Sequence, residues 1–203
     1  MANPLVPFKF VRMREKRFNL ASRLLHWAIA ITFLYIMLTV LLRMGWMNKG
    51  SMGTIIKENL SEQNISIKQD DAFAIAKKVR KPMWKTHTIA GYVLVGLFVL
   101  RMILTWVQGA GFVNPLKKGI SQYEKFKSWV YVVFYLLLGA SLFTGLMMEF
   151  GPESLEHTME DIHVLSLYYS IAFILLHTVG VLMADAGRER GIISKIISGD
   201  RPL

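Results

Sequence analysis

Residues 163–184, HVLSLYYSIAFILLHTVGVLMA, form an apolar run that contains two histidines and no charged side chain. At about 1.5 Å per residue, a helix of this length covers about the 30 Å of a bilayer's hydrocarbon core. His163 and His177 are 14 residues apart, which on an ideal helix places them within roughly 40° of each other and roughly 21 Å apart along the axis. Histidine is costly inside a bilayer and indicates a functional site. The run therefore predicts a membrane-spanning helix with one functional histidine near each surface.

Three other apolar runs of similar length precede this one, in a chain of 203 residues that is 53% hydrophobic. Only one of them is interrupted by a charge, at Arg101. The first run follows a basic stretch but is too long for the apolar region of a signal peptide, so we expect an uncleaved span. We predict an all-α membrane protein, a four-helix transmembrane bundle forming a single domain over residues 1–203. The predicted spans are Leu24–Leu42, Thr88–Val107, Trp129–Met148 and Val164–Ala184.

The formal net charge of +10 is distributed as in a membrane protein. The segments on the side of the two termini hold 14 Lys and Arg, and the opposite side holds nine, all between Arg43 and Lys85. The positive-inside rule then places both termini in the cytoplasm. Topology and contact with membrane lipid account for most of this charge, and we expect no nucleic-acid partner.

Two amphipathic segments lie outside the spans. After Asp70 and Asp71, apolar residues recur at helical spacing until Pro82, which predicts an amphipathic outer-loop helix lying flat on the membrane. The tail predicts a short C-terminal interfacial helix on the cytoplasmic side. It combines Ile192, Ile193, Ile196 and Ile197 with Arg188, Arg190 and Lys195. The outer segment carries what we call the outer basic patch: Lys77, Lys78, Arg80, Lys81 and Lys85.

Four of the five histidines fall at matched depths when the spans run alternately through the bilayer. His26 and His177 lie near the cytoplasmic ends of the first and fourth spans, and His87 and His163 lie at the outer starts of the second and fourth. Depth alone predicts that His26 pairs with His177 and His87 with His163. Two neutral imidazoles saturate haem iron and leave no open position for oxygen chemistry. We therefore predict two b haems with an electron-transfer role.

Any haem must be held by side-chain ligands alone. The chain has no cysteine, which excludes disulfides, iron–sulfur ligation and covalent c-type haem. Arg101 lies 14 residues after His87 and so near the predicted inner haem, where a haem propionate would supply the anionic partner that a buried arginine needs. Arg23 is a second candidate there, and Lys81 and Lys85 are candidates on the outer side.

A histidine in a span can also be a hydrogen-bonded packing residue. This alternative applies to any one histidine taken alone, but four at paired depths argue against it. His157 lies 20 residues before His177, which turns it about 200° away on an ideal helix. Because it also sits among acidic residues, we expect it at the surface. Five span glycines suit close helix approach and would also make room for a flat macrocycle. They are Gly91, Gly96, Gly139, Gly145 and Gly180.

An ordered set of motifs runs through the chain: Arg23-Leu-Leu-His26-Trp27, then Lys85-Thr-His87 followed by Gly91 and Arg101, then His163 and His177, and finally Ile196-Ile-Ser-Gly199. This set resembles the bacterial cytochrome b561 family, which is similar in turn to the b-type cytochrome subunit of nickel-iron hydrogenases. The resemblance covers essentially the whole chain. It implies a four-helix bundle with two b haems that exchanges electrons with membrane quinone.

Members of that family differ in what they serve. Some resemble superoxide oxidases, which pass an electron from superoxide to ubiquinone, and others carry electrons for a hydrogenase or a formate dehydrogenase. In the first case the outer basic patch would attract a small anion, although lipid headgroups are a plainer ligand for it. In the second case the long loop between the first two spans, absent from compact members, would dock a periplasmic redox partner. A third hypothesis is a helical membrane scaffold without cofactor.

The predicted quinone contacts are Trp84 and Lys85. An amphipathic aromatic side chain and a hydrogen-bond donor beside the outer haem would suit a quinone head group. Tryptophans near the ends of spans are most often interfacial anchors, and Lys85 would equally suit a haem propionate.

Overall fold

Helices dominate the structure, a computed structural model that describes residues 19–107, 114–187 and 189–199. The N-terminal basic stretch through residue 18 and Arg188 of the tail, which contributed to the charge and helix predictions, lie outside these ranges. No strand occurs in the described ranges, and four helical segments are long and apolar enough to cross a membrane. The prediction of an all-α, four-span membrane protein is confirmed. The helices are α1 (Leu20–Met44), α2 (Lys49–Glu62), α3 (Gln69–Val107), α4 (Gln122–Phe150), α5 (Glu153–Val164), α6 (Ser166–Ala186) and α7 (Ile192–Ser198).

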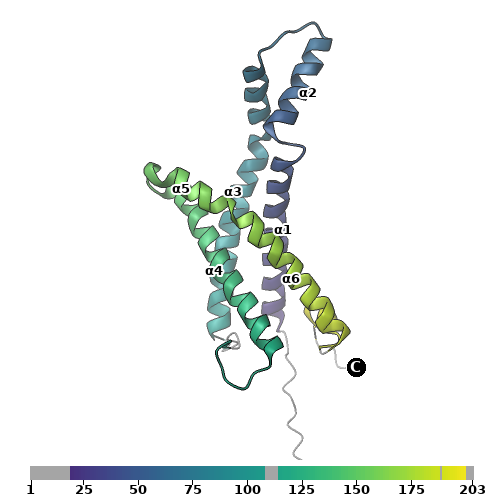
Figure 1. The fold of residues 1–203 in the computed structure, drawn as a ribbon, viewed down its shortest axis with the longest axis vertical. Coiled ribbons are helices and arrows are strands. Elements are labelled where there is room, and N and C mark those ends of the chain that lie inside the picture. The colour runs from purple at the N-terminus through teal and green to yellow at the C-terminus, as the bar shows by residue number, and fades with distance from the viewer. Residues whose placement is uncertain (1–18, 108–113, 188, 200–203) are drawn as a thin grey trace, which may run out of the picture.

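The bundle is built from two sets of packed helices, one of α1, α2 and α3 and the other of α4, α5 and α6. α1 and α3 run side by side along the long axis of the molecule, and α6 runs diagonally across the view (Figure 1). α4 packs against α5 and α6, and it meets α3 over a shorter stretch. Polar side chains cap the starts of α1 and α4, because the first N–H groups of a helix lack partners within it. Asn19 accepts from Ser22 N at 2.8 Å, and Ser121 forms a reciprocal capping box with Glu124.

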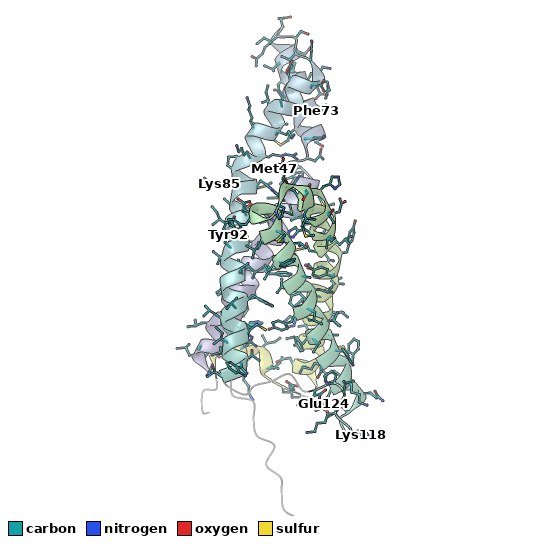
Figure 2. All side chains as sticks on the ribbon, turned by 90° about the vertical axis from the view of Figure 1, so that its left-hand side faces the viewer. Met47, Phe73, Lys85, Tyr92, Lys118 and Glu124 are labelled. Carbon is teal, nitrogen blue, oxygen red and sulfur yellow. The ribbon has the colours of Figure 1, made fainter. Side chains whose placement is uncertain are left out.

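α3 is too long to be a membrane span alone. Its 39 residues extend about 58 Å, roughly twice the thickness of a hydrocarbon core. The first half of α3 packs against α2 beyond the other spans, forming an outer hairpin (residues 49–83) (Figure 1). In Figure 2, Phe73 lies in this hairpin, at the opposite end of the molecule from Lys118 and Glu124. The hairpin is tightly packed, since Ala72 and Ala76 are fully buried and a Cβ at Gly53 would overlap the Phe73 ring.

Two predictions for the outer loop are wrong. Pro82 does not end a helix but lies inside α3, and the segment before it projects with the outer hairpin instead of lying flat on the membrane. A proline inside a helix costs about 3 kcal/mol because it removes one hydrogen bond and clashes with the preceding turn. Lys78, whose carbonyl loses this hydrogen bond, is an exposed residue, and α3 packs against α2. α2 itself was not predicted, because its polar composition and two internal glycines give little helical signal.

The fourth span is not one uninterrupted helix. α5 ends at Val164 and α6 begins at Ser166, and the joint at Leu165 is closed by two short-range backbone bonds. Leu165 N donates to Ile162 O and Tyr168 N donates to Leu165 O, each at 3.2 Å, so both bonds join residues three apart. The angle of roughly 40° predicted between His163 and His177 assumed one ideal helix, and it therefore does not apply across this joint. α5 also fills most of the segment between the third and fourth predicted spans.

The predicted C-terminal helix is present as α7, and it docks on the start of α1. Arg23 Nη2 donates to Ile197 O at 2.6 Å, and Trp27 Nε1 donates to Ile196 O at 3.2 Å. A salt bridge of 3.1 Å between Lys127 and Glu189 adds α4 to this contact. The first and last described residues consequently lie on the same side of the bundle, as an even number of spans requires.

Candidate functional site

The inner pair consists of His26 on α1 and His177 on α6. Their ring centroids are 6.2 Å apart, and the ring planes differ by 43°. A metal–imidazole bond is about 2 Å long, and the ring centroid lies roughly 1 Å beyond the nitrogen. Two imidazoles on opposite sides of one metal ion therefore have centroids roughly 6 Å apart. The observed separation suits two axial ligands of one iron.

Aromatic rings enclose the inner pair. Phe173 stacks on His177, with centroids 5.5 Å apart and planes within 20°. Tyr131 and Trp27 form T-shaped contacts with His177 and His26, with ring centroids 6.3 Å and 5.7 Å apart. Such a shell limits access of water and lowers the local dielectric constant, both of which tune a bound metal centre.

The two arginines predicted near the inner haem have different surroundings. Arg101 is half-buried, interacts electrostatically with His26 and donates from Nε to the hydroxyl of Tyr135 at 3.3 Å. Within the described ranges it forms no ion pair with a carboxylate. Arg23 faces the end of α7, and its buried Nε has no hydrogen-bond partner. Contacts of both arginines with a propionate stay predictions.

On the outer side, the protonation of His87 follows from its hydrogen bonds. Thr39 Oγ1 lies 2.8 Å from His87 Nδ1 and 2.6 Å from Ile36 O. A carbonyl only accepts, so the single hydroxyl proton of Thr39 goes to Ile36, and the hydroxyl must accept a proton from His87. Nδ1 therefore carries the proton, which leaves a lone pair on Nε2.

His163 has the same tautomer for a more direct reason. Its Nδ1 lies 3.0 Å from Ser141 O, a carbonyl that can only accept, and 3.1 Å from Thr144 Oγ1. His163 and His87 are close enough to interact electrostatically. An imidazole that donates from one nitrogen to a fixed acceptor and presents the other nitrogen is the usual form of a metal-ligating histidine. Nε2 of both outer histidines is therefore unprotonated and able to bind a metal.

The span glycines differ in their surroundings. A Cβ added at Gly91 or Gly180 would meet nothing within 4 Å, whereas a Cβ at Gly145 would lie 3.2 Å from Cε1 of His163. Unfilled space therefore lies beside the first two glycines, and Gly145 lets α4 approach the outer histidine closely. Together with the inner pair of imidazoles, this space fits a haem b group, which the histidines would hold by its iron.

Positive charge gathers in a groove of about 330 Å³ on the outer side. We call it the basic groove, and it is lined by Arg43, Lys77, Lys78, Arg80, Lys81, Met83 and Trp84. Arg43, which ends the first span, was missed because no sequence pattern shows which side chains converge from different helices. The predicted Lys85 is exposed and does not line the groove, and Figure 2 shows it on the flank of α3. His157 is exposed as predicted, with Nδ1 3.1 Å from Asp161 Oδ2.

Comparison with known proteins shows which family the chain belongs to. A sequence model of the prokaryotic cytochrome b561 family matches residues 17–199, a range that includes all four span histidines. Comparisons with curated proteins and with solved structures found no match. The match covers most of the chain, and it agrees with the four apolar helices. The chain therefore belongs to the prokaryotic cytochrome b561 family, and it is a multi-pass membrane protein that binds haem b and transfers electrons.

Proposed function

We propose that this protein is a di-haem cytochrome b that carries electrons between the periplasmic side of a bacterial inner membrane and the quinone pool. The observation that carries the proposal is the arrangement of the histidines at two levels. The inner rings are 6.2 Å apart, and both outer rings present an unprotonated Nε2. When bound, haem would supply reversible one-electron chemistry, and two histidines at each level would leave its iron no open position.

The chain's own residues would bind the haem iron and neutralise the haem propionates. In the proposed roles His26 and His177 hold the inner haem, and His87 and His163 hold the outer one. Arg101 lies beside the inner pair, where its free N–H groups can donate to a propionate. Arg23 on the inner side, and Lys81 and Lys85 on the outer side, are proposed for the remaining propionates.

We propose that the substrate is superoxide, which is oxidised while quinone is reduced. Two superoxide anions each lose one electron and leave as dioxygen, and one quinone takes both electrons and two protons to become quinol. The basic groove supports this choice, because clustered positive charge raises the association rate of a small anion by about 10- to 1000-fold at low salt. Trp84 and Lys85 remain the proposed quinone contacts. We place both termini in the cytoplasm, which puts the groove on the periplasmic side.

The first test is a reduced-minus-oxidised spectrum of the purified protein, with extracted haem quantified per chain. We expect two low-spin b haems in the wild type, loss of the inner one in His26→Ala and loss of the outer one in His87→Ala. His157→Ala is the matched control and should keep both. Superoxide consumption and quinone reduction are then measured on the same preparations. A wild-type protein that stays colourless after reconstitution with haem would overturn the proposal and favour a helical scaffold.

A second candidate function is an electron-transfer subunit of a hydrogenase- or dehydrogenase-type complex. The observation that favours it is the outer hairpin, which projects beyond the spans and offers a surface to a periplasmic redox partner. Purification in mild detergent distinguishes the two functions. A stable complex with a redox enzyme supports the subunit, whereas a protein that isolates alone and consumes superoxide supports the standalone enzyme.

A further inference from the structure

The indole of Trp84 lies flat against the imidazole of His87. Their ring centroids are 4.4 Å apart, and the planes differ by only 6°. The two residues are three positions apart on α3, a spacing that brings side chains onto the same face of a helix. The hydrogen bond to Thr39 fixes one atom of the imidazole but lets the ring rock about that atom. Contact along a whole face of the ring removes this freedom.

Arg43 extends this contact from α1. Its guanidinium carbon lies 4.1 Å from the centroid of the Trp84 ring, within the range of a cation–π interaction. Arg43 also interacts electrostatically with His87, with Arg80 and with Glu160 of α5. At the level of the outer pair, α1 and α3 are thus joined by the hydrogen bond to His87 and by the Arg43–Trp84 contact, and Tyr35 also donates to Thr86 at 2.7 Å.

The same two side chains line the basic groove. Its other cations are Lys77, Lys78, Arg80 and Lys81, and within the described ranges none of the groove's cations lies within 4.0 Å of a carboxylate oxygen. Their charge is therefore available to a small anion. An anion in the groove would face the guanidinium that contacts Trp84, and Trp84 in turn contacts the outer histidine.

We propose that Trp84 positions the ring of His87 and that Arg43 couples the charge of the basic groove to the outer haem site. This inference rests on the proposed function, because it needs His87 as an axial ligand. Reduced haem carries one positive charge fewer than oxidised haem, so a nearby cation favours reduction. Loss of the Arg43 charge, or its neutralisation by an anion in the groove, lowers the midpoint potential of the outer haem only.

Ring orientation is tested by electron paramagnetic resonance of the oxidised protein, because the g values of low-spin haem depend on the angle between the two imidazole planes. Trp84→Leu removes the flat contact and should shift the outer-haem signal, while Trp84→Phe keeps an aromatic face and should stay near the wild type. The matched control is Trp46→Leu, since Trp46 is also on the outer side but 85% exposed. An unshifted signal in Trp84→Leu, or equal loss of the outer haem in both Trp84 variants, overturns the positioning role.

Charge coupling is tested by redox titration, with sodium phosphate replacing sodium chloride at constant ionic strength. We expect Arg43→Gln to lower the midpoint potential of the outer haem and Arg43→Lys to leave that potential close to the wild-type value. The midpoint potential of the inner haem should stay unchanged in both variants. Phosphate should lower the outer potential of the wild type and leave that of Arg43→Gln unaffected. An equal response to phosphate in both proteins would refute the role of Arg43. A wild-type protein without haem would instead refute the proposed function, and this inference with it.

Discussion

Replacing Thr39 with valine removes the hydroxyl that accepts the His87 proton while keeping the shape of the side chain, and it leaves only the interaction with the Ile36 backbone. Thr39 is only 2% exposed, and its Oγ1 lies 2.8 Å from His87 Nδ1. Leaving a buried N–H donor unpaired costs about 1–3 kcal/mol. Loss of an outer-shell partner of a metal ligand typically weakens metal binding about 10- to 100-fold, or about 1.4–2.7 kcal/mol. The two estimates agree, so we expect the outer haem to dissociate about 10 to 100 times faster.

The equivalent change at the partner histidine should have a smaller effect. In Thr144→Val the His163 proton keeps a second acceptor, Ser141 O at 3.0 Å. The imidazole then loses one of two hydrogen-bond acceptors and keeps the closer one. We therefore expect haem to dissociate less than about tenfold faster. The order of the two variants rests on the 3.0 Å hydrogen bond that His163 keeps to Ser141 O, whereas His87 keeps only a backbone interaction with Ile36.

Haem loss is measured by transfer to excess apomyoglobin, followed by absorbance. The outer haem is isolated in a His177→Ala background, in which the inner haem is absent. Thr105→Val is the matched control, because the Thr105 hydroxyl donates only to Arg101 O in its own helix at 2.7 Å. The reasoning fails if Thr39→Val loses haem no faster than this control, or if Thr144→Val has the larger effect.

Two further predictions concern the outer side. Replacing both Lys81 and Lys85 with glutamine should slow superoxide consumption at low ionic strength, and the loss should shrink as salt screens the charge. Lys118→Gln, at the opposite end of the molecule, should not slow it. Equal rates in the double variant and the wild type at low salt would exclude electrostatic attraction by the outer basic patch. Gly53→Ala would force a Cβ into the Phe73 ring, and overpacking of this kind costs about 1–3 kcal/mol. Hydrogen exchange in α2 should then accelerate about fivefold or more, and unchanged exchange would show that the outer hairpin adapts to the added atom.

The sequence by itself determined the class of the protein and the depth of its histidines. A hydrocarbon core demands about 20 apolar residues in a row, and a helix rises by a constant amount per residue. Both are local properties that can be counted along the chain, which is why four spans and the level of His26 and His177 followed without coordinates. The match of residues 17–199 to the family agrees with that count.

Only the tertiary structure decided which side chains hold the histidines. Thr39 and His87 are 48 residues apart, and Arg43 reaches Trp84 from another helix, so these contacts depend on how α1 rotates against α3. No periodicity in one segment encodes that rotation. The uninterrupted course of α3 through Pro82 was also decided by packing, since α2 supplies contacts that a proline considered alone lacks. Local pattern set the depth of each residue in the membrane, and packing between helices set which residues meet at that depth.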